Sequence, residues 1–175
     1  MLALEEINNA VDKTSMELAL EKHAKTLNLD LTDYNYDYFN AKNRQASVTQ
    51  YVFDSKKQKN AALTIEEVQK AFIHGLAYEQ GKLSFSKALM QDELSLDHFN
   101  ALKKTYEDEV SFRGESEIST NALKAIQKVL DLPEDDQLTA IEQLEYQFSD
   151  ELVPGKNPFK INDVFKYINE QLFQG

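Results

Sequence analysis

The hydrophobic positions of this chain recur at spacings of three and four residues, which is the period of an amphipathic helix. Near the start, Leu4, Ile7 and Val11 follow this spacing. β-Branched residues seldom alternate with polar ones over the length of a strand, and only five Gly and three Pro interrupt 175 residues. The pattern therefore predicts an all-α fold of about eight or nine short helices, packed as tandem helical hairpins or a bundle.

Similar stripes place the other helices and their buried faces. The positions on these stripes are Met16, Ala19, Leu20, His23, Ala24 and Leu27; Ala41, Val48 and Val52; Ile65, Val68, Phe72 and Leu76; Leu96, Phe99, Leu102 or Lys103, Tyr106 and Val110; Leu123, Ile126 and Leu130; Leu138, Ile141, Leu144, Phe148 and Leu152; and Ile161, Val164, Phe165, Ile168 and Leu172. Residues 85–90 are expected to form a short separate helix.

Residues that cap helices precede several of these stripes. Thr14 with Glu17, and Thr64 with Glu67, have the spacing of a capping box. The other predicted N-caps are Ser95, Ser116 or Ser119, Asp135 or Asp136, and Asn157 with Pro158 at the first helical position. The lysine-rich segment 54–60 is predicted to be a flexible loop, and Gly81 to lie near the end of the helix that starts at residue 65.

A helical segment recurs along the chain. Ile65–Phe72 and Ile161–Ile168 share Ile, an acidic residue, Val, Lys and a large apolar residue in register. Weaker similarity links 7–12 and 19–21 to 126–131 and 140–142. We expect degenerate repeats, in units 1–82 and 83–175 packed as one compact domain; the alternative is chance similarity between amphipathic helices.

The chain is acidic, with 30 Asp and Glu against 19 Lys and Arg and a formal net charge of -11. Such a surface repels nucleic-acid phosphates and anionic lipids, so we expect no nucleic-acid partner. Solubility is the ordinary explanation of the charge; a mimic of nucleic acid and a surface that collects cations are the alternatives.

No stretch approaches the roughly 20 apolar residues of a membrane span, and no signal sequence is recognisable at the start, so no membrane insertion is expected.

Residues that could carry chemistry are sparse. Cysteine is absent, and the three histidines, His23, His74 and His98, form no metal-binding spacing. We expect His23 to be hydrogen-bonded and partly buried. Acidic and amide side chains between Asn28 and Asn35 lack the central Gly and closing Glu of a calcium-binding loop. The sequence therefore predicts no catalytic, cofactor-binding or metal-binding residue, no cofactor and no enzymatic activity.

Aromatic residues gather between positions 34 and 53. The interaction candidates are Tyr34, Tyr36, Tyr38, Phe39 and Tyr51, with Phe53 beside them. They form either a core between helical units or a partly exposed surface that docks a protein or a glycan, since Tyr offers a large contact area and a polar tip.

Residues 3–78 contain an ordered series of short segments: Ile7-Asn-Asn-Ala10, Ala19-Leu-Glu21, Leu27-Asn-Leu-Asp-Leu-Thr-Asp-Tyr-Asn35, Ala46-Ser-Val48 and Thr64-Ile-Glu-Glu-Val-Gln-Lys-Ala-Phe72. In this order they resemble a helical repeat of surface-layer-associated and other large envelope proteins of Gram-positive bacteria. The aromatic run 36–39 and the basic segment 56–60 depart from that repeat. The resemblance implies a non-enzymatic tandem helical domain of an envelope, phage or prophage structural protein, without catalytic residues.

These observations favour a structural or protein-interaction module of a bacterial surface or phage-related protein, with a protein partner. One alternative is an intracellular acidic regulator or inhibitor that binds a basic protein surface. Another is a helical accessory domain of a larger enzyme. The resemblance implies a location at the cell surface or outside the cell; without it, the cytoplasm is expected.

Overall fold

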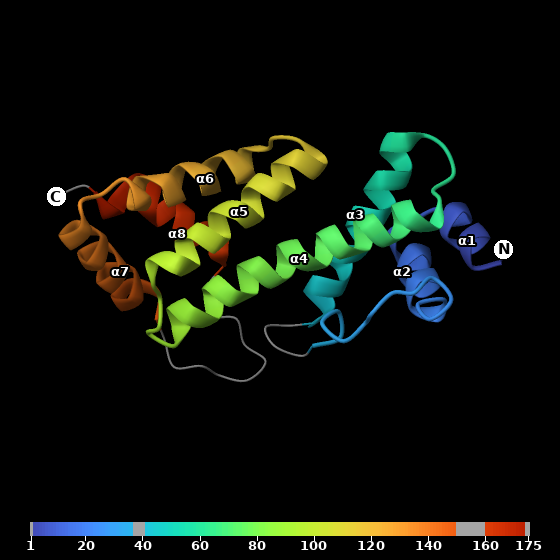
Figure 1. Cartoon of the computed structure of the whole chain (residues 1–175), viewed down its shortest axis with the longest axis horizontal. Helices are drawn as coiled ribbons and strands as arrows, with labels where there is room; N and C mark the ends of the chain where they lie inside the picture. Colours follow the sequence, from blue (N-terminus) through green and yellow to red (C-terminus); the bar gives the residue numbers. More distant parts are fainter. Residues whose placement is uncertain (1, 37–40, 150–159, 174–175) are drawn as a thin grey trace. The chain divides into compact units, whose positions relative to one another are not determined.

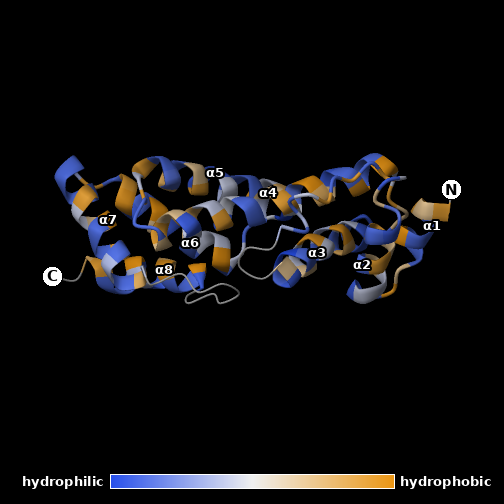
Figure 2. Cartoon of the chain, turned by 90° about the horizontal axis from the view of Figure 1, so that it is seen from below, coloured by the Kyte–Doolittle hydropathy of each residue, from blue (hydrophilic) through white to orange (hydrophobic). Residues whose placement is uncertain are grey.

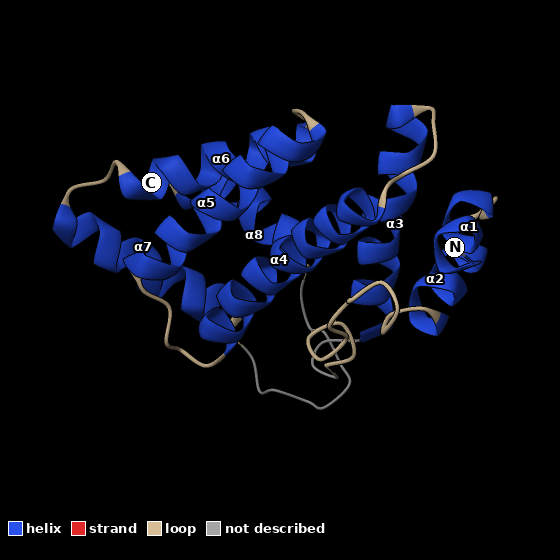
Figure 3. Ribbon diagram, turned by 45° about the vertical axis from the view of Figure 1, so that its right-hand side comes forward, coloured by secondary structure: helices blue, strands red, loops and turns tan. Residues whose placement is uncertain are grey.

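The computed structural model describes residues 2–36, 41–149 and 160–173, and these residues form helices and loops without a strand (Figure 3). The helices are α1 (Leu2–Asn9), α2 (Lys13–Lys22), α3 (Ala41–Lys59), α4 (Ile65–Met90), α5 (Leu96–Arg113), α6 (Glu117–Leu130), α7 (Glu134–Phe148), α8 (Ile161–Tyr167) and the π-helical segment η1 (Ile168–Leu172). The all-α prediction is confirmed. None of the described helices is both long and apolar enough to cross a membrane.

The chain divides into two compact units, unit 1 (Met1–Glu79) and unit 2 (Gln80–Gly175). The division falls within α4, so each unit contains part of that helix. Packing of the repeats as one compact domain stays a prediction.

Unit 1 is built around α2, which packs against α1 and α3 (Figure 1). Its core includes the fully buried side chains of Ile7, Met16 and Leu20. Asn8 joins α1 to the segment before α4, because its side chain donates to Leu63 O at 3.1 Å and accepts from Leu63 N at 2.7 Å. These two bonds satisfy backbone groups that would otherwise lack a partner near the start of a helix.

Unit 2 is built around α6, which packs against α5, α7 and the C-terminal helix formed by α8 and η1 (Figure 1). Aromatic pairs connect its helices: Phe85 and Phe99 meet edge to face at 5.2 Å, and Tyr106 and Phe165 at 5.4 Å. Hydrophobic and hydrophilic residues share the same helices (Figure 2), as amphipathic packing requires.

The lysine-rich segment is helical, so the predicted loop at 54–60 is wrong for residues 54–59. Lys56 Nζ donates to Ala10 O at 2.5 Å, and Lys59 Nζ contacts Glu67 Oε1 at 2.5 Å. Basic side chains at the end of a helix also interact favourably with its dipole. The helix α3 therefore continues to Lys59, and both of these lysines have partners outside it.

Gly81 does not end a helix, and residues 85–90 are not a separate one, because α4 continues from Ile65 to Met90. A Cβ at Gly81 would lie 2.2 Å from Thr105 Oγ1 and 2.7 Å from Thr105 Cγ2. Glycine is therefore required for the close approach of α4 to α5 within unit 2.

The capping predictions have mixed outcomes. Thr64 N donates to Glu67 Oε1 at 3.0 Å and Glu67 N to Thr64 Oγ1 at 3.2 Å, which confirms that box. Ser95 and Ser116 are confirmed as N-caps. The box at Thr14 is wrong, because Asp12 caps α2 and accepts from Ser15 N at 2.8 Å.

At α7 the predicted cap is also wrong. Pro133 occupies the cap position, and Glu134, Asp135 and Asp136 form the first turn, where carboxylates favour the helix dipole. Asn157, Pro158 and Leu152 lie outside the described residues. Leu138, predicted to lie on the apolar stripe of its helix, is 57% exposed. Val11, predicted to belong to the first helix, lies beyond the end of α1 and is 83% exposed.

Candidate functional site

The aromatic interaction candidates separate into core and surface positions. Tyr34 and Tyr51 are fully buried in unit 1. Tyr34 packs 5.6 Å from the ring of Phe72, and Tyr51 packs 6.1 Å from that of Tyr78. Tyr34 and Tyr51 are therefore core residues and not part of an exposed docking surface.

Among the described residues, the remaining candidates do not form a continuous aromatic surface. Tyr36 is 46% exposed, with the Arg44 guanidinium 6.0 Å from its ring centre. Tyr38 and Phe39 lie outside the described residues. Phe53 is half-buried, with Lys57 Nζ 5.3 Å from its ring.

Two glutamates of α2, Glu17 and Glu21, lie near Tyr34. The Tyr34 hydroxyl donates to Glu21 Oε1 at 3.0 Å, and burial raises the pKa of Tyr34 above its ordinary value. One turn away on α2, partial burial and the neighbouring Glu21 carboxylate raise the pKa of Glu17. Two carboxylates at positions i and i+4 repel each other when both are charged.

Glu17→Gln is expected to raise the melting temperature at pH 7. Because the folded-state pKa of Glu17 is raised, its favourable contribution is present below the unfolded-state pKa and is lost as pH rises through the folded-state pKa. The gain should disappear below about pH 4, where glutamate is protonated in the unfolded chain. Thermal unfolding across this pH range checks it, with Glu107→Gln on an exposed face of α5 as the control. An equal gain at both pH values would contradict this account.

Two of the histidines, His23 and His98, form local hydrogen bonds. His23 Nε2 lies 2.8 Å from Glu6 Oε2 and its side chain is 11% exposed, which confirms the prediction of a hydrogen-bonded, partly buried residue. Hydrogen bonds from His23 and Lys22 lower the pKa of Glu6. His98 Nδ1 accepts from Ser95 N at 3.1 Å at the start of α5.

The segment considered for calcium has a turn. Asp30 Oδ1 accepts from Thr32 N at 2.9 Å, and this bond lowers the pKa of Asp30. Within the described ranges, no three side chains of His, Asp or Glu are grouped so that they could hold a metal ion.

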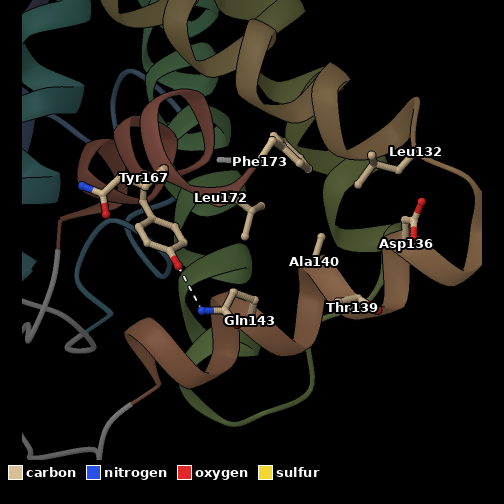
Figure 4. Close-up of a pocket in the computed structure, with 9 residues that line it drawn as sticks. Leu132, Asp136, Thr139, Ala140, Gln143, Tyr167, Leu172 and Phe173 are labelled. Carbon is tan, nitrogen blue, oxygen red and sulfur yellow. Dashed lines mark hydrogen bonds between the residues drawn. The ribbon is translucent and has the colours of Figure 1, made fainter. Parts of the chain in front are cut away.

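A groove of about 500 Å³ lies in unit 2 between α7 and the C-terminal helix (Figure 4). We call it the α7 groove. Its lining residues are Leu132, Asp136, Thr139, Ala140, Gln143, Tyr167, Gln171, Leu172 and Phe173. Leu132, Ala140, Leu172 and Phe173 form an apolar surface, and the neutral polar groups of Thr139, Gln143 and Gln171 stand beside it.

Helical spacing explains how α7 forms its wall of the groove. Positions 136, 139, 140 and 143 lie on one face of the helix because they are three or four residues apart. Across the groove, Gln143 Nε2 donates to the Tyr167 hydroxyl at 3.1 Å (Figure 4). The Phe148 and Tyr167 rings meet edge to face at 5.4 Å, so two contacts fix the separation of the walls.

The opposite wall contains the π-helical segment. Segments of this kind are rare and often occur at functional sites. Here α6 holds η1 in place: Lys128 Nζ donates to Asn169 O at 3.2 Å, and Asn169 Nδ2 donates to Asn121 O at 3.0 Å. The wider π turn immediately precedes Phe173 and contributes Gln171 and Leu172 to the groove.

The groove lies in a negative environment. Among the described residues of the lining, Asp136 is the one that is charged, and α7 contains five Asp and Glu but no Lys, Arg or His. In the sequence of unit 2, eighteen Asp and Glu stand against ten Lys and Arg. The α7 groove therefore combines an apolar surface with a negative side.

Unit 1 also has a hollow, of about 580 Å³, between the end of α1 and the end of α3. Its described lining includes the apolar Val11 and Phe53 and the polar Asn8, Lys57 and Asn60, so apolar lining does not distinguish it from the α7 groove. We take the α7 groove as the candidate site because one of its walls contains a π-helical segment, a feature that often occurs at functional sites.

The hydrophobic pattern does not predict this groove. It places Leu138 on the apolar stripe of α7, whereas Leu138 is exposed and Ala140 is buried. A signal was present in the charge pattern, because residues 134–148 contain acidic but no basic side chains.

No protein family model, curated protein or solved structure matches this chain. The resemblance of residues 3–78 to an envelope-protein repeat stays a prediction.

Proposed function

We propose that this chain is a non-enzymatic protein-interaction module and that unit 2 binds a segment of another protein in the α7 groove. The observation that carries this proposal is the apolar surface of Leu132, Leu172 and Phe173 beside neutral hydrogen-bonding side chains. An apolar centre with a polar rim is typical of surfaces that bind proteins.

The exposure of the groove favours a protein segment over a small molecule. Phe173 is 42% exposed, and Thr139 and Gln143 are also exposed along α7. Small-molecule sites usually enclose most of the surface of their ligand. An open groove leaves one side of its occupant in solvent, which suits a segment that belongs to a larger protein.

The setting that we propose is a bacterial surface or phage-related protein. It rests on the resemblance of residues 3–78, which lie in unit 1, and it is independent of the groove in unit 2.

A second candidate function is an acidic regulator that binds a basic protein surface. The five carboxylates of α7, without a basic residue in that helix, favour it. Such binding would depend mainly on charge and would weaken steeply as salt screens it. Binding in the α7 groove would also require the apolar surface.

The test is selection from a displayed random peptide library against the immobilised chain. Selected peptides should lose at least about tenfold in affinity for Thr139→Trp, which fills the groove without changing charge. They should keep their affinity for Leu138→Trp, a matched change at an exposed position of the same helix. Peptides that bind both variants equally, or a selection that enriches no groove-dependent peptide, would contradict the proposal.

A further inference from the structure

We infer that the partner segment is an amphipathic helix that places Lys or Arg beside its apolar stripe. This inference rests on the proposed function of the α7 groove and specifies the chemistry of its occupant. Three properties of the groove support it: the secondary structure of its walls, the distribution of its apolar groups and its charge.

The walls of the groove favour a helical occupant. They belong to α7 and the C-terminal helix, with Leu132 between α6 and α7, and no strand edge occurs in the described part of unit 2. Hydrogen bonds within these helices use most of their backbone groups, so an extended peptide would find few backbone partners. A helix satisfies its own backbone and needs only side-chain contacts, as in other helix-in-groove complexes.

The apolar groups come from separate parts of the chain. Leu132 precedes α7, Ala140 lies within it, and Leu172 and Phe173 lie at the end of the C-terminal helix (Figure 4). They can therefore contact more than one side chain of an occupant. Side chains three or four residues apart on a helix lie about 5–6 Å from each other and form such a continuous stripe.

The charge of the groove favours a cationic occupant. Asp136 lines the groove, and Glu134 and Asp135 belong to the same first turn of α7. The dipole of α7 adds only about half a positive charge at this end, so three carboxylates leave it negative. The lining residues that the structure describes include no Lys or Arg that would attract an acidic segment.

A second copy of this chain fits the groove less well. The lysines near the end of α3 are the densest basic group in a described helix, but Lys56 contacts Ala10 and Lys59 contacts Glu67 in the same chain. A different protein with a cationic amphipathic helix is therefore the occupant that we propose.

Two synthetic helical peptides of about 18 residues test this inference. Both have the same leucine stripe; one has lysines beside it and the other glutamates. At about 50 mM salt, fluorescence anisotropy should show saturable binding of the lysine peptide to the full chain. Asp136→Lys should weaken it at least about tenfold, whereas Glu142→Lys, the same charge change on another face of α7, should change it less than about twofold.

The outcomes separate the two proposals. Equal weakening by Asp136→Lys and Glu142→Lys would overturn the inference, because it would show general attraction to an acidic surface. In another outcome, the glutamate peptide binds as tightly as the lysine peptide and loses affinity for Thr139→Trp. This result would overturn the inference of a cationic partner and leave the proposed function of the groove intact. Absence of binding by either peptide, or self-association that Thr139→Trp abolishes, would also overturn the inference; the library selection decides the function independently.

Discussion

Tyr34→Ala is expected to lower the free energy of unfolding of unit 1 by about 3–5 kcal/mol. The Tyr34 ring is fully buried and packs against Phe72, so its loss leaves a cavity as well as reducing apolar burial. The hydroxyl bond to Glu21 is lost as well. Such a loss is large compared with the total stability of an ordinary domain.

The matched control is Tyr36→Ala, two residues away at a position that is 46% exposed. Its contact with Arg44 at 6.0 Å supports a change of no more than about 1 kcal/mol. Urea unfolding, with hydrogen exchange of unit 1 amides to localise the effect, distinguishes the two variants. Similar losses in both would contradict the assignment of Tyr34 to the core and Tyr36 to the surface.

Gly81→Ala is expected to destabilise unit 2 by about 1–3 kcal/mol, although alanine favours helices by about 1 kcal/mol over glycine. The new Cβ would overlap Thr105 Oγ1 at 2.2 Å and Thr105 Cγ2 at 2.7 Å. Thr105 is short and branched at Cβ, so it has little freedom to move away. Either α4 or α5 must shift, and packing elsewhere in unit 2 is lost.

A double-mutant cycle isolates this contact. Thr105→Ala removes the two closest atoms and leaves Cβ at 3.0 Å, so the double variant should recover at least about 1 kcal/mol relative to the sum of the single changes. Chemical unfolding of the four proteins gives this coupling energy. Additive effects, or a stabilising Gly81→Ala, would show that α4 and α5 do not require glycine at this position.

Local sequence signals predicted much of the fold because they act within one helical turn. Thr64 and Glu67 form the predicted capping box, and Val68 and Phe72 are buried as their spacing indicates. The errors arose where distant contacts outweigh local preference. Lys56, within α3, has a hydrogen-bond partner 46 residues away, and Gly81 allows packing against Thr105 instead of ending α4.

The candidate site was less accessible to sequence reasoning. Only its charge was visible in advance, in the acidic run of α7. The groove itself depends on contacts across the chain, such as Gln143 with Tyr167, and on a π turn whose carbonyl at Asn169 is bound by Lys128. The aromatic cluster did not distinguish a binding surface from a core, because a high density of Tyr and Phe is compatible with both. Tyr34 and Tyr51 lie in the core.

The most direct test of the groove as a binding site is backbone NMR of the full chain, titrated with the tightest peptide from the library selection. We expect the largest chemical-shift changes at residues 136–143 of α7 and 167–173 of the C-terminal helix, with little change in unit 1. Changes confined to unit 1, or to the face of α7 that contains Leu138 and Tyr146, would contradict it.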